Sequence, residues 1–149
     1  MAAGDLVPID QNVARYCRPT AIENDRALGA AFVLEGTHHE LSVTWLEKLE
    51  PIPDRLLQIR AAATAITRSG FRMKRNGALA VLAVAAIVED IDCGATLLHL
   101  QVLEFPELEN PAHCGITNLP QQGSEFSTLV GLVLASRVAE PIYYVRDHL

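Results

Sequence analysis

Residues 76–88 read NGALAVLAVAAIV and form the longest apolar stretch of the chain. An Asn-Gly pair favours a tight turn, and the aliphatic residues after it favour a buried strand. We therefore predict a central strand that starts at Gly77 and passes into a helical turn before Val88. The eleven apolar residues from Ala78 to Val88 are about half of the ~20 that a membrane-spanning helix needs, so we place them in a protein core.

Two amphipathic helices flank this strand in the sequence. Asp54 is a suitable N-cap for a helix from Arg55 to about Ser69. Ser124 can cap a second helix from Glu125 to about Ala139. In both, apolar residues recur at spacings of three and four, which places them on one face that should pack on a sheet. The expected core-facing residues are Leu56, Ile59, Ala63 and Ile66 in the first helix and Phe126, Leu129, Val130, Val133 and Leu134 in the second.

Alternating or β-branched stretches predict the other strands. The stretch 41–46 alternates apolar and polar residues, and its end could equally turn into a short helix. The stretch 96–105 should lie beside the strand that starts at Gly77. The remaining candidates are Val13 to Cys17, Gly29 to Leu34, which could form a hairpin with it, and an edge strand from Ile142 to Val145. Together these elements predict one α+β domain over residues 1–149, with a small mixed or antiparallel sheet packed against two main helices.

Composition supports a folded chain and argues against a nucleic-acid partner. Half of the 149 residues are hydrophobic and a fifth are charged, as in globular proteins. The net charge of −6 opposes binding to a phosphate backbone. One basic cluster, Arg68, Arg72, Lys74 and Arg75, lies at the end of the first helix and in the turn after it. It could bind phosphate, but a solvated face that complements the helix dipole is the simpler interpretation.

The cysteines indicate a reducing compartment. Cys17, Cys93 and Cys114 are odd in number and widely spaced, unlike a secreted disulfide scaffold. The first sixteen residues contain neither a basic region nor an apolar stretch of the kind found in secretory signals. We therefore expect free thiols, a cytoplasmic location and no membrane partner.

Three residues from separate elements could carry chemistry. His113, beside a proline-containing loop, could act as a general acid or base, or its ring could bond a backbone carbonyl of that loop. Ser42 shares a strand face with Thr44, so their hydroxyls could line a groove. No G-x-S-x-G elbow surrounds Ser42, so we do not expect it to be a hydrolase nucleophile. The guanidinium of Arg15 could bind a phosphate or carboxylate, although an ordinary surface ion pair is the commoner use.

Trp45 is the only tryptophan and could be a core anchor or, at an exposed rim, an interaction hot spot. We expect no metal, because the available ligand types lack any pair at ligand spacing. These are His38, His39, Cys17, His113 and Cys114. We also expect no cofactor, because the chain has neither a P-loop nor a G-x-G-x-x-G motif.

Two stretches carry a resemblance to other proteins. Ala31-Phe32 precedes residues 40–47, ELSVTWLE, and residues 110–114 read NPAHC. This arrangement resembles an uncharacterised group of small bacterial proteins with an AF element, an ELSV element and a downstream NPAH element. The likeness extends from about Val13 to the final helix. It implies a bacterial origin, and the group has no assigned activity.

Two functional hypotheses follow, and the sequence leaves open whether the protein is an enzyme. The first is a non-catalytic interaction or accessory module of a bacterial system, which binds a protein partner through an apolar patch around Trp45 or the final helix. The second is a small enzyme of unknown class whose cleft is built from Arg15, Ser42 and His113. A separation of more than about 15 Å between Arg15 and His113 would exclude the second, because both groups must reach one substrate.

Overall fold

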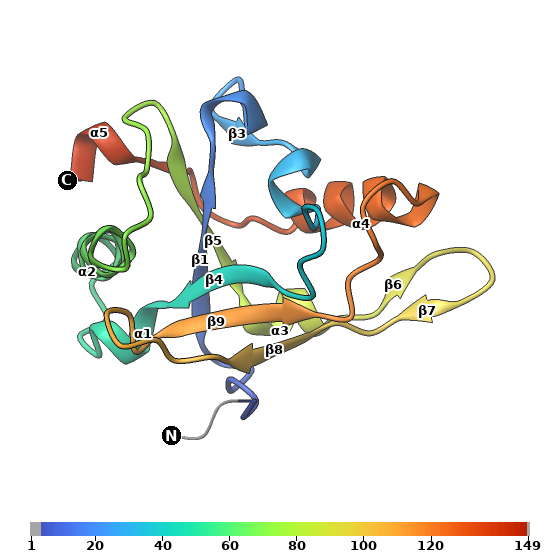
Figure 1. The fold of residues 1–149 in the computed structure, drawn as a ribbon, viewed down its shortest axis with the longest axis horizontal. Coiled ribbons are helices and arrows are strands. Elements are labelled where there is room, and N and C mark those ends of the chain that lie inside the picture. Colours follow the sequence, from blue (N-terminus) through green and yellow to red (C-terminus); the bar gives the residue numbers. More distant parts are fainter. Residues whose placement is uncertain (1–3, 149) are drawn as a thin grey trace.

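A computed structural model describes residues 4–148, so residues 1–3 and 149 of the expected domain lie outside the described part. The core element is a six-stranded antiparallel sheet with strand order β10-β5-β1-β4-β9-β8. Helices of more than one turn cover its two faces (Figure 1). The predicted α+β class is confirmed. The strands are β1 (Asn12–Cys17), β4 (Leu41–Trp45), β5 (Ala78–Ala83), β8 (Gln101–Glu104), β9 (His113–Thr117) and β10 (Tyr143–Tyr144).

The apolar stretch after Gly77 forms the strand predicted for it. β5 pairs with β1 along its whole length, from Asn12↔Ala83 to Cys17↔Ala78. The chain then turns directly into the short helix α3 (Val84–Val88). Residues 78–82 of β5 are buried on both faces of the sheet, which explains why the stretch shows no alternation.

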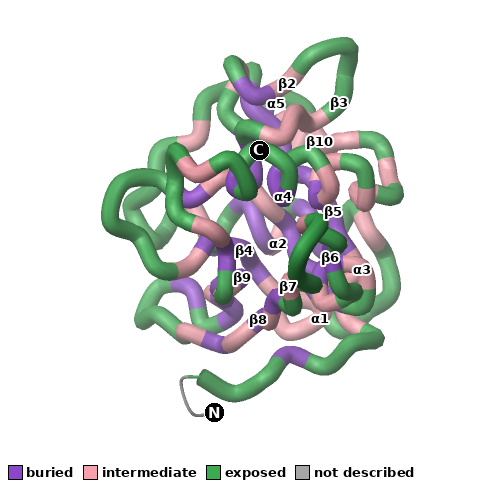
Figure 2. Tube along the Cα trace, turned by 90° about the vertical axis from the view of Figure 1, so that its right-hand side faces the viewer, coloured by how far each residue is buried: buried purple, intermediate pink, exposed green. Residues whose placement is uncertain are grey.

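The two predicted helices lie on opposite faces of the sheet. The Asp54 carboxylate accepts hydrogen bonds from the first-turn amides of α2 (Arg55–Arg68), and Ser124 caps α4 (Glu125–Ser136) in the same way. Ile59 and neighbouring alanines of α2 pack against β1 and β5, whereas α4 packs on the larger cluster across the sheet. Leu56 of α2 is 47% exposed, and Phe126 and Leu129 of α4 are 40% and 38% exposed, so the core positions predicted for these three residues are wrong. Figure 2 shows that buried residues gather on the central strands between these layers.

The stretch from Gly29 to Leu34 is not a strand, and it forms no hairpin with β1. It forms a 3₁₀ helix, η2 (Gly29–Phe32), that packs against α4. The reason is close backbone contact, because a Cβ atom on Gly131 of α4 would lie 2.6 Å from the Gly29 carbonyl oxygen. Small side chains there favour docking against the helix over pairing in the sheet.

The stretch 96–105 is two strands, and neither lies beside β5. β7 (Leu97–Leu98) pairs with β6 (Ile91–Asp92) in a separate hairpin, and β8 pairs with β9 at the far edge of the sheet. The unpredicted strand β9 lies between β8 and β4 and so separates β8 from β5. The predicted edge strand near the C-terminus is present as β10, beside β5.

Short elements complete the described chain. They are η1 (Pro19–Ala21), the hairpin of β2 (Ile22–Glu23) and β3 (Arg26–Ala27), α1 (Leu46–Leu49) and α5 (Val145–His148). Helix α1 directly continues β4, as the alternative for that stretch predicted. Between residues 4 and 148 no helix combines the length and apolarity needed to cross a membrane.

The sheet opens between β1 and β4. Their pairing consists of Val13↔Trp45 and Ala14↔Thr44, although β1 continues to Cys17 and β4 begins at Leu41. Figure 1 shows β4 crossing β1 and then diverging from it. The backbone groups of β4 that precede Thr44 therefore need hydrogen-bond partners other than β1.

Candidate functional site

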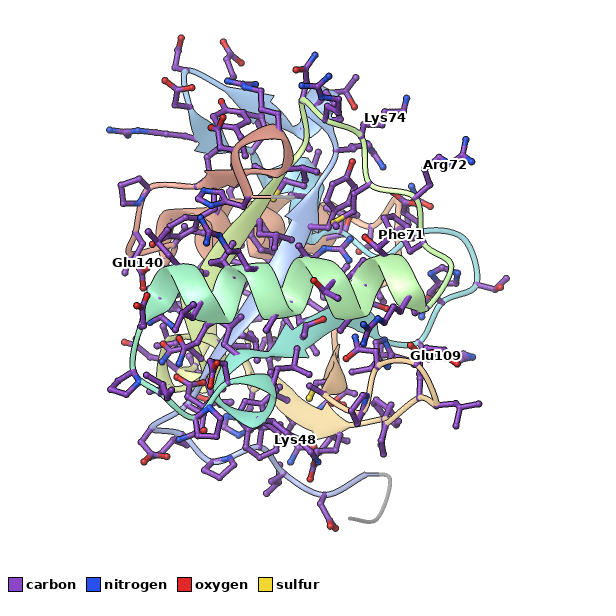
Figure 3. All side chains as sticks on the ribbon, turned by 90° about the vertical axis from the view of Figure 1, so that its left-hand side faces the viewer. Lys48, Phe71, Arg72, Lys74, Glu109 and Glu140 are labelled. Carbon is purple, nitrogen blue, oxygen red and sulfur yellow. The ribbon has the colours of Figure 1, made fainter. Side chains whose placement is uncertain are left out.

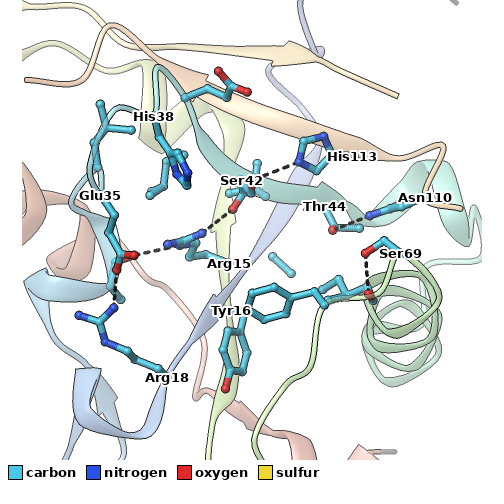
Figure 4. Close-up of a pocket in the computed structure, with 18 of the residues that line it drawn as sticks. Arg15, Tyr16, Arg18, Glu35, His38, Ser42, Thr44, Ser69, Asn110 and His113 are labelled. Carbon is cyan, nitrogen blue, oxygen red and sulfur yellow. Dashed lines mark hydrogen bonds and ion pairs between the residues drawn. The ribbon is translucent and has the colours of Figure 1, made fainter. Parts of the chain in front are cut away.

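A pocket of about 510 Å³ lies where β1 and β4 diverge. It is lined by both strands, by the segment 30–40, by the C-terminal end of α2 with the residues that follow, and by the loop between β8 and β9. Figure 4 shows the side chains that face it. Three of the four residues singled out in the sequence, Arg15, Ser42 and His113, line this pocket.

Ser42 and His113 are brought together by the register of β4 and β9. Ser42 lies opposite Gly115, and Thr44 lies opposite His113. Residues two apart on a strand share a face, so Ser42 and His113 are diagonal neighbours on one face of the sheet. Their side chains meet, with 3.2 Å between Ser42 Oγ and His113 Nε2.

The second ring nitrogen of His113 defines the direction of this hydrogen bond. His113 Nδ1 lies 2.8 Å from the carbonyl oxygen of Phe105. A carbonyl oxygen only accepts, so Nδ1 carries a proton, and in the neutral ring Nε2 is then an acceptor. The Ser42 hydroxyl therefore donates to Nε2. The Ser42 hydroxyl, the His113 ring and the Phe105 carbonyl thus form one chain of hydrogen bonds, an order that would suit a nucleophile, a base and an orienting group.

The NPAH element positions His113 in this chain. Asn110 is buried, its side-chain oxygen accepts from the Ala112 amide at 3.2 Å, and its Nδ2 donates to Thr44 Oγ1 at 3.3 Å. The backbone amide of His113 also donates to the Asn110 carbonyl. Asn110 thus fixes the loop that enters β9 and ties it to the strand that carries Ser42.

Glu40 lies beside this pair because Gly115 leaves room for it. A Cβ atom at Gly115 would lie 2.6 Å from Glu40 Cγ and 2.7 Å from Glu40 Cβ. Glu40, the residue before β4, therefore packs over Gly115 of β9 on the face of Ser42, and it lines the pocket. Our sequence reasoning missed Glu40 as a site residue. Its position two residues before Ser42, directly before the expected strand 41–46, was the available signal.

Arg15 fills the opening between the two strands. Its Nε donates to the Ala31 carbonyl and its Nη1 to the Ser42 carbonyl, each at 2.9 Å. Burial lowers the pKa of the guanidinium, and the nearby charge of Glu35 partly opposes this effect. A guanidinium still remains protonated, and two of its five N–H donors are occupied by the carbonyls. The Arg15 side chain therefore takes the place of the β1 backbone as a hydrogen-bond partner of Ser42 in β4.

Arg15 and His113 thus share Ser42 as a hydrogen-bond partner. This arrangement meets the geometric condition set for the enzyme hypothesis. Trp45 is not part of it. Its half-buried indole donates to Gln11 Oε1 at 2.9 Å, and Lys48 Nζ lies 5.3 Å from the ring centroid. Trp45 is therefore a packed anchor at the other end of β4.

One wall of the pocket is aromatic. Tyr16 of β1 and Phe71, which follows α2, pack edge to face with their ring centroids 5.3 Å apart. The Tyr16 hydroxyl accepts a hydrogen bond from the Lys74 amide at 2.9 Å. Tyr16 therefore anchors the loop that carries Phe71, and both rings offer an apolar surface to the pocket that Ser42 also lines.

Two of the three cysteines, Cys17 and Cys114, are buried and are not arranged as reactive or metal-binding groups. Burial raises the pKa of Cys17 to about 11. Burial, with the charge of Glu104, raises the pKa of Cys114 to about 12. Both therefore remain neutral thiols, whereas a metal ligand or nucleophile is a thiolate. Within residues 4–148 no three His, Cys, Asp or Glu side chains are grouped to hold a metal ion.

Comparison with known proteins adds no assignment to this geometry. No protein-family model, curated protein or solved structure matches the chain. The resemblance to a group of proteins with AF, ELSV and NPAH elements therefore stays a prediction.

Proposed function

We propose that this protein is a small acyl-transfer enzyme, a hydrolase that uses Ser42 as nucleophile and His113 as general base. The observation that carries the proposal is the hydrogen-bond chain from Ser42 through His113 to the Phe105 carbonyl, at the wall of a pocket. A serine hydroxyl is a weak nucleophile until an adjacent base removes its proton. His113 Nε2 is at hydrogen-bond distance from that proton.

The proposed reaction has two acyl-transfer steps. Ser42 Oγ attacks the carbonyl carbon of an ester or thioester while His113 Nε2 takes the hydroxyl proton. The bond to the leaving group then breaks, and His113 returns the proton to the departing oxygen or sulfur. Water attacks the acyl-serine in the second step, with His113 again as base, and releases a carboxylic acid and free Ser42.

Neighbouring charges fit this role. The Phe105 carbonyl holds the ring in the tautomer that accepts from Ser42, as the carboxylate does in a catalytic triad. Glu40 lines the same pocket, and its negative charge favours the imidazolium that forms during attack. Arg15 donates to the Ser42 carbonyl and lines the same pocket, and its remaining donors are suited to stabilise the developing oxyanion.

Ester hydrolysis tests the proposal. We expect wild-type protein to hydrolyse p-nitrophenyl hexanoate and Ser42→Ala to abolish this activity. His113→Gln should lower kcat/KM by at least about a hundredfold, the usual contribution of a general base. Ser136→Ala and His99→Gln are matched controls, because both residues are exposed and lie outside the pocket. Equal activity in Ser42→Ala and Ser136→Ala would contradict the proposal.

The interaction module expected from composition is the second candidate function, and one observation favours it. On α4 the outer face presents Phe126, Leu129 and Leu132, which are 40%, 38% and 56% exposed. An apolar helix face of this kind suits a protein partner. An affinity pull-down that compares wild type with Leu129→Ser/Leu132→Ser tests it. Loss of a stoichiometric partner in the folded variant supports the module, and retention of the partner contradicts it.

The bacterial and cytoplasmic assignments belong to the same proposal. Two of the three thiols are buried and free, which suits a reducing compartment. The net negative charge again argues against nucleic acid as the partner.

A further inference from the structure

Four cations at the end of α2 form a cluster that the proposed mechanism does not use. Arg68, Arg72, Lys74 and Arg75, here called the basic loop, are all exposed. Among residues 4–148 none of them forms an ion pair. They contribute a third of the 12 Lys and Arg residues of a chain with net charge −6. Such a concentration of unpaired charge is a local positive potential on an otherwise acidic protein.

The basic loop adjoins the Ser42 pocket, because Ser69 and Phe71, which lie between Arg68 and Arg72 in the sequence, line the pocket, while the four cations lie outside its lining. Phe71, within the loop, lines the pocket and packs on Tyr16. The backbone amide of Lys74 is held by the Tyr16 hydroxyl, so the loop is anchored to β1. Figure 3 shows Phe71 and Arg72 together just beyond the C-terminal end of α2. The cations are therefore presented from a fixed loop beside the opening.

The opposite side of the mouth is acidic. Glu107 lines the pocket, and Glu109, in the same loop between β8 and β9, is exposed. Figure 3 places Glu109 on the other side of the end of α2 from Phe71 and Arg72. An anionic ligand group is repelled by this loop and attracted by the basic loop, so the mouth orients a charged substrate.

We propose that the substrate of the Ser42 site carries its acyl group on a leaving group that bears phosphate groups. The phosphates bind the basic loop outside the pocket, and the acyl chain lies against Tyr16, Ile66 and Phe71 inside it. Arg and Lys are the side chains that bind phosphate best, through charge-assisted hydrogen bonds. The acyl-transfer part of this inference rests on the proposed function, whereas the phosphate-binding part rests on the basic loop alone.

Binding and turnover of two probes test this inference. The probes are hexanoyl-coenzyme A, whose leaving group carries phosphates, and p-nitrophenyl hexanoate, whose leaving group does not. Binding is measured by calorimetry on Ser42→Ala, which holds substrate without acyl transfer. The loop variant is Arg72→Gln/Lys74→Gln. The control is Arg26→Gln/Arg60→Gln, which makes the same change in net charge at exposed residues outside this pocket.

We expect the loop variant to bind hexanoyl-coenzyme A about tenfold more weakly, as the loss of two exposed charge contacts implies, with less than about a twofold change in the control. In proteins that retain Ser42, the ratio of kcat/KM for hexanoyl-coenzyme A to that for the neutral ester should fall by about the same factor. Added salt should weaken binding to the intact loop more than to the loop variant.

The outcomes separate this inference from the proposed function. Equal loss in loop variant and control, or no binding of hexanoyl-coenzyme A, overturns the phosphate proposal even if Ser42 hydrolyses the neutral ester. Loop-dependent binding without turnover of either probe supports the phosphate site and contradicts the acyl-transfer function. Tighter loop-dependent binding of a short single-stranded oligonucleotide would overturn the small-molecule proposal in favour of a nucleic acid.

Discussion

Replacement of Arg15 by methionine should destabilise the protein because Arg15 supplies hydrogen bonds that β1 no longer makes. Methionine keeps much of the length and apolar stem of arginine but donates to neither the Ala31 nor the Ser42 carbonyl. The Ala31 bond is partly buried and the Ser42 bond is exposed. Loss of a charge-assisted bond costs ~1.5–3 kcal/mol when buried and less when water replaces the donor. We therefore expect the free energy of unfolding to fall by about 2 kcal/mol.

Urea unfolding followed by circular dichroism measures this change. For a chain of this length the same loss corresponds to a decrease in Tm of about 4–8 °C. Arg18→Met is the matched control, because Arg18 forms only an exposed ion pair with Glu35, together with a bond to Thr20. The control should cost less than about 1 kcal/mol. If the two variants lose the same stability, Arg15 does not hold the opening between β1 and β4.

Two further predictions concern the packing of α4 and the buried thiols. Gly131→Ala should lower the free energy of unfolding by about 1–3 kcal/mol, because the new Cβ would meet the Gly29 carbonyl. Alanine usually stabilises a helix relative to glycine, so the expected sign is the reverse of the usual one. Unchanged or increased stability in urea would contradict this contact. Iodoacetamide at pH 8 should modify the half-exposed Cys93 in native protein and spare Cys17 and Cys114, as peptide mass mapping would show. Because the pKa values of those two thiols are raised to about 11 and about 12, their contribution to stability is complete below the unfolded pKa of ~8.5 and is lost as pH rises through the folded values. Rapid modification of all three thiols, or stability that rises between pH 9 and 11, would refute this description.

The sequence predicted the elements that have local signals. The caps Asp54 and Ser124 and the turn before Gly77 each depend on residues within a few positions. Those elements appear near their predicted starts. The 3₁₀ helix at Gly29 depends instead on the approach of α4, about a hundred residues further along. No local pattern distinguishes such docking from strand pairing.

The candidate site shows the same division. Ser42, His113 and Arg15 were each identifiable as chemically capable residues, but their contact depends on the register of β4 and β9. β9 itself, His113–Thr117, is short and contains a glycine, which weakens its strand signal. Without that strand, the diagonal relation between Ser42 and His113 has no basis. The roles of Glu40 and Gly115 likewise follow only from the cross-strand pairing.

Whether Ser42 is an activated nucleophile is tested most directly by a fluorophosphonate probe and mass spectrometry. The probe transfers its phosphonyl group to an activated serine with loss of fluoride, and it needs no knowledge of the natural substrate. We predict one phosphonyl group per molecule, on the peptide that contains Ser42, and its loss in a folded His113→Gln variant. Absence of labelling, labelling at another serine, or unchanged labelling in His113→Gln would contradict the proposed Ser42–His113 pair.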